Sequence, residues 1–226
     1  MDGEGTPHCA YAAMGRFLMH IVGIDLGKKA GKPMSHQKIQ ALTEGAVMVA
    51  AATSLSYLKL LELPQGGSVC IGMLPIFLFC ARWGWKESFL TAFAYGMLQL
   101  IFDGAYAWGP TSMLLDYVLA FGVLGVACLF RKQKGGVYIG TVVGCLCRFL
   151  VHFISGITIY RIYEPTEVFN TTFTNPYLYS AVYNGSMVID LVLCLVITAL
   201  LYRPLSRYFA PQETVAAVKR NQGPEL

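Results

Sequence analysis

The sequence has 226 residues, of which 55% are hydrophobic and 13% charged, and its mean hydropathy is +0.53. A soluble globular domain carries about 25% charged residues, so this composition excludes an ordinary soluble protein and indicates a membrane protein. The formal net charge of +4 is spread over short clusters, which excludes the continuous basic face of a nucleic-acid-binding domain.

We expect three parts along the chain. They are a cytoplasmic N-terminal extension of unknown role over residues 1–40, a membrane domain over residues 41–203, and a cytoplasmic C-terminal tail over residues 204–226. The apolar patch Phe17–Ile24 in the extension is too short to cross a bilayer, so it does not add a span.

Apolar segments follow one another through the membrane domain, separated by polar or Pro- and Gly-containing turns. In chain order, helices are expected at about Ala41–Leu61, Val69–Ala81, Glu87–Phe102, Met113–Lys132, Val137–Tyr160 and Tyr177–Tyr202. The fourth reads MLLDYVLAFGVLGVACLFRK, and at about 1.5 Å per residue it is long enough to cross a bilayer. The expected fold is therefore an all-α bundle of six transmembrane helices in a lipid bilayer.

Basic residues fall on alternate connections between these helices. They are Lys28, Lys29, Lys32 and Lys38 before the first helix, Arg82 and Lys86 after the second, Arg131, Lys132 and Lys134 after the fourth, and Arg203 and Arg207 after the sixth. Because Lys and Arg accumulate on the cytoplasmic side of membrane proteins, both termini are predicted to be cytoplasmic.

Small residues mark one face of the first helix. Ala46 and Ala50 are four residues apart, so their methyl groups share a face and allow another helix to approach closely. Packing within the bundle and contact with another subunit are both compatible with this spacing.

A carboxylate, Asp116, lies near the start of the fourth helix. A charge in the membrane costs about 2.5–3.5 kcal/mol on insertion scales, so it usually faces a cavity or a partner. With the predicted topology, His152 and Asn184 lie at a similar depth in the fifth and sixth helices. Tyrosines gather near the same end of the bundle: Tyr106, Tyr160, Tyr177 and Tyr179. Together these groups favour a pocket for a small aromatic cation, because rings attract cations and a carboxylate pairs with an amine.

Each of these residues also has a structural interpretation. A tyrosine near a helix end is often an interfacial anchor, and His152 alone fits a hydrogen-bonded histidine of the bundle. Arg148 is expected to be structural, with Asp190 as a candidate partner. The seven cysteines show neither paired nor metal-ligand spacing, so we expect buried free thiols and no metal site.

Four stretches carry a family resemblance: LTEGAVMVA (Leu42–Ala50), LLDYVLAFGVLGVACLFRK (Leu114–Lys132), FLVHFISGI (Phe149–Ile157) and YSAVYNG (Tyr179–Gly185). In content and order they resemble the thiamine-specific S-components of energy-coupling factor (ECF) vitamin transporters. The resemblance implies a multi-pass protein of a prokaryotic cell membrane that captures thiamine from outside. It further implies no cofactor and no ATPase activity of the chain itself, which would dock on an ECF transmembrane coupling subunit driven by two ATPase subunits.

The resemblance also implies a set of binding residues. The acidic pyrimidine ligand of the family falls on Asp116, with Tyr117 beside it, and the family's histidine falls on His152. Its tyrosine–asparagine pair falls on Tyr179 and Asn184.

Further positions follow from the same resemblance. A pocket tyrosine falls on Tyr106, and Tyr160 stands where a tryptophan is usual. The small-residue docking motif falls on Ala46 and Ala50. The chain departs from the family in having Asp116 where glutamate is typical, and in lacking an aromatic residue in its first outer loop.

Other functions are compatible with some of these features. The ligand could be another vitamin or a thiamine precursor, and Asp116 with His152 could form the acid–base pair of a small membrane enzyme. No nucleophile elbow, metal-ligand spacing or phosphate loop accompanies that pair. A self-sufficient transporter is a third alternative, but no inverted repeat is evident.

Overall fold

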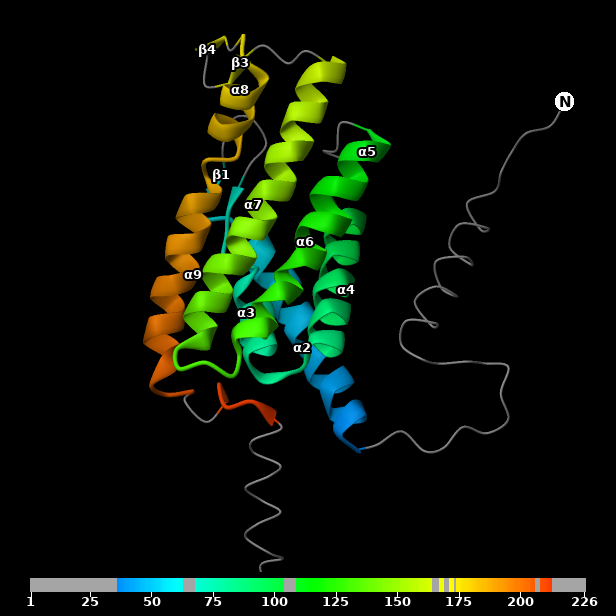
Figure 1. Ribbon diagram of the computed structural model, residues 1–226. Helices are drawn as coiled ribbons and strands as arrows, with labels where there is room; N and C mark the ends of the chain where they lie inside the picture. Colours follow the sequence, from blue (N-terminus) through cyan, green and yellow to red (C-terminus); the bar gives the residue numbers. More distant parts are fainter. Residues whose placement is uncertain are drawn as a thin grey trace, which may run out of the picture. The chain divides into compact units, whose positions relative to one another are not determined.

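The computed structural model describes residues 36–62, 68–103, 109–163, 167–168, 171–172, 174–205 and 208–212. Backbone contacts divide the chain into Met1–Ile39 and Gln40–Leu226, and the second unit forms the helical bundle (Figure 1). The α-helices of the bundle are α2 (His36–Tyr57), α3 (Leu74–Arg82), α4 (Trp85–Asp103), α5 (Pro110–Ser112), α6 (Ala120–Gly122), α7 (Gly136–Tyr163), α8 (Pro176–Tyr183) and α9 (Met187–Tyr202). The first of them, α2, begins four residues before the second unit.

Two other helical segments and two strand pairs complete the described chain. The π-helix η2 (Met113–Leu119) and the 3₁₀-helix η3 (Val123–Phe130) continue α5 and α6 into one segment. Strand β1 (Leu61–Glu62) pairs antiparallel with β2 (Ser68–Val69), and β3 (Glu167–Val168) pairs antiparallel with β4 (Thr171–Thr172).

The helices of the described chain group into six segments: α2, α3, α4, α5 through η3, α7, and α8 with α9. The prediction of an all-α membrane fold is therefore confirmed. Three segments are long and apolar enough to cross a membrane by themselves: Pro110–Phe130, Gly136–Ile162 and Pro176–Tyr202. The cytoplasmic placement of both termini and the division into extension, membrane domain and tail stay predictions, and residues 1–35 and 213–226 lie outside the described chain.

Helix α3 is the centre of the bundle. Every residue from Leu74 to Ala81 is buried, and α3 contacts η3, α7 and α4. Its nine residues would rise only about 14 Å, so α3 is enclosed by longer helices rather than spanning alone. Figure 1 shows it in the interior of the bundle, with α9 on one side and α4 on the other.

Large apolar side chains cover the outside of the longer helices. Examples are Ile101, Leu129, Leu150, Ile154, Val192, Val196 and Leu200, which are all at least half exposed. A soluble protein rarely leaves such a surface uncovered, whereas lipid tails solvate it. The outer face of the bundle is therefore the lipid-facing surface.

The central segment departs from regular α-helix at the predicted carboxylate. Asp116 lies within η2, and the 3₁₀ turns of η3 follow three residues of α6. A π-helix is rare and occurs frequently at functional sites because it redirects side chains within a helix. The local winding of η2 thus sets the direction in which Asp116 points.

Two helix boundaries differ from expectation. The first helix begins at His36 and ends at Tyr57, because Leu61–Glu62 is taken up by pairing with the strand at Ser68–Val69. The second begins at Leu74 rather than Val69. Pro75 fits its first turn, where the missing N–H removes no internal hydrogen bond.

The sixth predicted helix is two helices joined by a turn at Asn184–Ser186. Asn and Gly are poor helix formers, and the Asn184 side chain donates to the Ser180 carbonyl, 3.0 Å away, at the end of α8. The break places Asn184 at a helix end rather than within a continuous span.

A polar cluster ties the end of the described chain to α2 and α3. Glu44 accepts a hydrogen bond of 2.7 Å from the indole Nε1 of Trp83, and its Oε2 atom lies 3.1 Å from Nε of Arg82. The Arg82 guanidinium lies 4.8 Å from the centre of the Tyr208 ring. Tyr208 therefore packs on the bundle rather than extending away from it.

Candidate functional site

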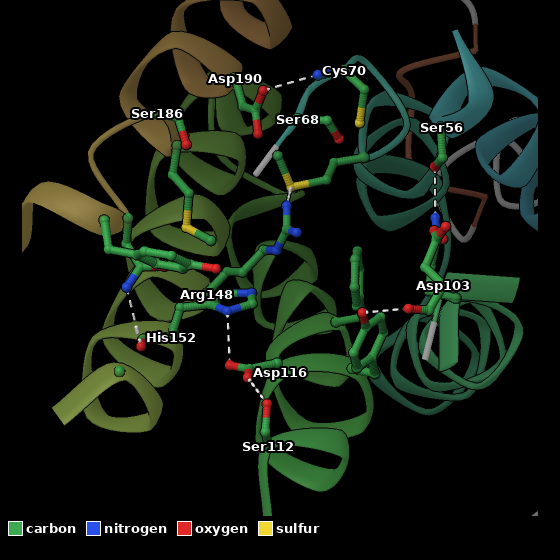
Figure 2. A pocket seen from close by; sticks show the side chains of 18 of the residues that line it. Ser56, Ser68, Cys70, Asp103, Ser112, Asp116, Arg148, His152, Ser186 and Asp190 are labelled. Carbon is green, nitrogen blue, oxygen red and sulfur yellow. Dashed lines mark hydrogen bonds and ion pairs between the residues drawn. The ribbon is translucent and has the colours of Figure 1, made fainter. Parts of the chain in front are cut away.

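A cavity of about 340 Å³ opens between the helices of the described chain. Five of the predicted binding residues line it: Asp116, Tyr117, His152, Tyr179 and Asn184. Figure 2 shows Asp116 and His152 facing each other across the space between η2 and α7. The volume falls within the range of about 300–1,000 Å³ that is typical of small-molecule sites.

The Asp116 carboxylate is held by two side chains. Its Oδ1 atom lies 3.0 Å from Nδ1 of His152, and its Oδ2 atom accepts a hydrogen bond of 2.6 Å from the Ser112 hydroxyl. A carboxylate offers about four acceptor positions, so two bonds fix its orientation and leave capacity for a ligand.

His152 has a free ring nitrogen. Because Nδ1 faces the carboxylate, that atom carries the proton of this contact. The Nε2 atom is buried and has no hydrogen-bond partner among the described residues. A buried polar atom without a partner is uncommon in native proteins, and at a cavity wall it marks a candidate contact for a ligand.

Asn184 is fixed by backbone carbonyls. Its Nδ2 atom donates to the carbonyl of Ser180 at 3.0 Å and to the carbonyl of His152 at 3.3 Å. The Oδ1 atom accepts no hydrogen bond from any described residue. This arrangement joins the end of α8 to α7 and leaves the amide oxygen as the atom available to a donor on a ligand.

Tyrosine rings stack along one wall of the cavity. The Tyr179 ring lies 5.9 Å from the Tyr183 ring in a stacked arrangement and 5.1 Å from the Tyr160 ring. Tyr179 and Tyr183 line the cavity, whereas Tyr160 packs against Tyr179 and is not among the described lining residues. The contact between the two tilted rings supports the position of Tyr179, so Tyr160 acts on the cavity wall only indirectly, by packing behind Tyr179.

The remaining predicted site residues lie elsewhere. Tyr106 falls in the segment 104–108, outside the described residues. Ala46 and Ala50 are exposed on α2, while Gly45 and Val49 are buried against the bundle. The face with Ala46 and Ala50 thus points away from the helices of its own chain, so the close packing that α2 makes within the bundle uses other residues.

Sequence reasoning missed several cavity residues. Arg148 lines the cavity although it was expected to be structural, and Asp190 lines it as well. Arg148 lies four residues before His152 on α7, and this spacing puts both side chains on one face. That signal could have placed Arg148 in the site.

A hydrogen-bonded trio of side chains was also missed. Gln99 donates to the Ser56 hydroxyl at 2.6 Å and to the Tyr95 hydroxyl at 2.8 Å, and the two hydroxyls lie 2.6 Å apart. All three residues line the cavity. The three residues come from two helices that are far apart in the sequence, so no sequence signal brought them together.

The architecture and the site define a class. A helical membrane bundle encloses a cavity that combines a buried carboxylate, an imidazole, an amide and aromatic rings. Groups of this kind can bind a small polar or cationic molecule. Among the described residues there is no group of His, Cys, Asp or Glu side chains arranged to hold a metal ion. The class is therefore a small-molecule-binding membrane protein.

Comparison with known proteins identifies the family. The model of the family described as "Thiamine transporter protein (Thia_YuaJ)" matches residues 42–210. The chain is 33% identical to the thiamine transporter ThiT of Bacillus subtilis over 187 residues, which are 76% of this chain and 94% of that protein. The chain belongs to this thiamine transporter family.

More distant relatives agree. The thiamine transporter ThiT of Lacticaseibacillus paracasei is 25% identical over 195 residues, 79% of this chain and 94% of that protein. The solved structure of ThiT from Listeria monocytogenes superposes with a TM-score of 0.66 at 20% identity, covering 78% of this chain and all of that one. At this identity the likeness concerns the fold alone. The predicted family, the transporter class and the multi-pass location in a prokaryotic cell membrane are confirmed, and an enzyme of the Asp116–His152 type is set aside.

Proposed function

We propose that the protein is the thiamine-binding S-component of an ECF-type importer and that the cavity of about 340 Å³ is its thiamine site. The observation that supports this assignment best is the Asp116–His152 pair at the cavity wall of a chain that belongs to the thiamine transporter family. Thiamine combines an aminopyrimidine with a permanently cationic thiazolium ring, and each part has a suitable partner in the cavity.

The aminopyrimidine needs hydrogen-bond partners. The remaining acceptor positions of Asp116 suit its amino group, and the free Oδ1 atom of Asn184 suits a second donor. The aspartate is one methylene shorter than the glutamate typical of the family, and Ser112 with His152 holds it in place. The shorter side chain is therefore compatible with a fixed acceptor at this position.

The thiazolium needs negative charge or ring faces. The rings of Tyr179 and Tyr183 stack along the wall, and a cation over a ring face gains about 0.5–2 kcal/mol, more when water is excluded. The carboxylates on the wall add to this attraction. The cavity thus offers partners for the aromatic ring and for the positive charge of the ligand.

Titration of the purified protein with thiamine tests this proposal. Truncating one partner of a buried charged hydrogen bond costs about 2–5 kcal/mol, and each 1.4 kcal/mol is a factor of ten. We therefore expect Asp116→Ala to weaken thiamine binding by about 30-fold or more. Asp116→Glu, which restores the family's usual acid, should keep binding within about tenfold of the wild type because the charge is retained.

The control is Glu87→Ala, which removes a carboxylate on α4 that does not line the cavity. Its affinity for thiamine should equal that of the wild type. Unchanged affinity in Asp116→Ala would remove the cavity pair from the site, and a wild type that binds no thiamine would overturn the ligand assignment.

We further propose that the Ala46–Ala50 face of α2 docks on an ECF transmembrane coupling subunit, which two ATPase subunits energise. Exposed small side chains allow a partner helix to approach closely in the membrane. The exposure of both alanines supports an external partner over packing within the bundle. Transport would then depend on this face, whereas ligand capture depends on the cavity.

A further inference from the structure

Arg148 is one of the charged residues on the cavity wall and lies one helical turn from His152 on α7. Its guanidinium lies 4.3 Å from the centre of the Phe121 ring, and its Nη1 atom donates to the sulfur of Met73 at 2.8 Å. Its Nε atom is buried without a hydrogen-bond partner among the described residues. A ring face and a thioether are weak acceptors for a guanidinium, which has five N–H donors, so Arg148 retains donors for a ligand.

Asp190 faces the same cavity from the first turn of α9. Its side chain is only 5% exposed, and its Oδ1 atom accepts one hydrogen bond of 3.1 Å from the backbone N–H of Cys70. A carboxylate has about four acceptor positions, so most of the capacity of Asp190 is not used by the described residues.

Arg148 and Asp190 do not form a direct ion pair, although both line the cavity. The sequence left open whether Asp190 pairs with Arg148, and among the described residues the two form no direct ion pair. In the view of Figure 2, Arg148 reaches between the Asp116–His152 pair on one side and Asp190 on the other. The cavity wall thus carries, away from the predicted pyrimidine site at Asp116, a hydrogen-bond donor in Arg148 and an acceptor in Asp190 that do not bind each other directly.

One ligand group fits such a pair: a hydroxyl, which accepts from the guanidinium and donates to the carboxylate. Thiamine carries a hydroxyethyl group on its thiazolium, at the end of the molecule away from the aminopyrimidine. A phosphate ester of the same hydroxyl has a charge of about −1.5 to −2 at neutral pH, and its main form is the dianion, which has no proton to donate. It would satisfy Arg148 but lie against Asp190, and like charges placed together in a water-poor site repel strongly.

We propose that Arg148 and Asp190 form a subsite that binds the free hydroxyl of the ligand, and that Asp190 selects against phosphorylated forms of it. This inference rests on the proposed function, because it assumes that thiamine occupies the cavity with its pyrimidine at Asp116. Asp190 is a specificity-determining residue, while Asp116 provides the affinity for the ring common to all the ligands compared.

The experiment measures the dissociation constants of thiamine, thiamine monophosphate and the analogue with ethyl in place of hydroxyethyl, with purified full-length protein. The wild type should bind thiamine at least about tenfold more tightly than either of the other two ligands. The ethyl analogue lacks the hydroxyl, and in the monophosphate the hydroxyl is replaced by a phosphate ester. Asp190→Asn keeps the side-chain shape but removes the charge. It should reduce the preference for thiamine over the monophosphate by at least about tenfold.

Arg148→Gln separates the two partners. This variant should weaken binding of the monophosphate at least as much as binding of thiamine. It should lower the affinity for the ethyl analogue least, because that ligand has no group that accepts a hydrogen bond from the guanidinium. The matched control is Asp103→Asn, which removes a different carboxylate from the cavity wall. It should keep most of the wild-type preference for thiamine over the monophosphate.

The outcomes are distinguishable. Equal shifts in Asp190→Asn and Asp103→Asn would mean that the total charge of the cavity sets the preference, which overturns the subsite. Wild-type protein that binds all three ligands equally overturns it as well, and this measurement needs no variant to fold. If the wild type binds no thiamine, the proposed function fails and the subsite falls with it. If Asp116→Ala loses binding while Asp190→Asn leaves the preference unchanged, only the subsite is wrong.

Discussion

Nδ1 of His152 lies 3.0 Å from Oδ1 of Asp116, which joins α7 to the π-helical turn of the central segment. Both side chains are mostly buried, with 13% and 18% of their surfaces exposed. Each partner therefore fixes the orientation of the other at the cavity wall, and a ligand meets them as one unit.

This contact predicts non-additive effects on thiamine affinity. We expect Asp116→Asn and His152→Gln each to weaken binding, and the double variant to lose less than the sum of the two losses. Groups that act as a unit show coupling energies of about 0.5–3 kcal/mol. The four dissociation constants, measured by calorimetry, give this coupling, and strictly additive losses would show that the two residues bind the ligand independently.

The Asp116–His152 pair could be predicted because a carboxylate and an imidazole within apolar segments stand out against their surroundings. Arg148 could have been assigned as well, since it shares the face of His152 on α7. The position of Asp190 could not be predicted, because helical periodicity gives the face of one helix and not the helix that packs against it. The same limit applies to Ser56, which meets Gln99 only because α2 and α4 are neighbours at that depth.

The shape of the helices themselves was only partly predictable. The segments were found from hydropathy, but the π-helix at Met113–Leu119 leaves no mark in composition. The turn at Asn184–Ser186 had a signal in its Asn and Gly residues, which was outweighed by the apolar sequence on both sides.

The second prediction concerns docking. Ala46→Trp should abolish thiamine uptake into cells while purified protein binds thiamine as tightly as the wild type, because the bulky ring separates α2 from its partner. The matched control is Ala199→Trp, the same change at an exposed alanine of α9. Uptake that fails equally in both variants, or binding that falls in Ala46→Trp, would contradict a docking role for this face.

The third prediction is the topology. A membrane-impermeant maleimide added to intact cells should label Glu62→Cys at the end of β1, and spare Lys132→Cys in the turn after η3. The reason is the concentration of Lys and Arg on the connections predicted to be cytoplasmic. The parent protein gives the background from its own cysteines. Labelling of Lys132→Cys from outside would invert the topology.

The fourth prediction is a pH dependence at Tyr208, which lies after the last helix. Burial, with the Glu44 carboxylate nearby, raises the pKa of Tyr208 to about 12 from its usual 10.0, although the Arg82 guanidinium acts to lower it. A raised pKa means that the folded state favours the neutral phenol. The stability from this group is therefore complete below pH 10 and is lost as the pH rises toward 12.

Thermal unfolding of the purified protein measures this effect. Wild type and Tyr208→Phe should have parallel melting temperatures up to about pH 10. Above that pH the wild type should lose stability more steeply than the variant, because residue 208 can ionise as tyrosine and cannot ionise as phenylalanine. Parallel curves over the whole range would show that ionisation of Tyr208 is not linked to folding.

The last prediction tests how closely α7 and α8 must approach to form the site. Gly156 lies one turn after His152 on α7, and a Cβ atom there would collide with the Ser180 hydroxyl and lie 3.4 Å from Nδ2 of Asn184. Ser180 itself donates a hydrogen bond of 2.7 Å to the Phe153 carbonyl. Gly156→Ala should therefore push α8 outward and displace from the cavity wall both Asn184 and Tyr179, the residue that precedes Ser180.

Because small misplacements of binding groups are costly, we expect Gly156→Ala to weaken thiamine binding by about tenfold or more. The matched control is Gly122→Ala in α6, where an added Cβ meets no atom within 4 Å. There the substitution should leave affinity unchanged and add up to about 1 kcal/mol of stability, because alanine is the better helix former. Titrating both variants with thiamine separates the two effects. Wild-type affinity in Gly156→Ala would show that the α7–α8 contact does not position the binding residues.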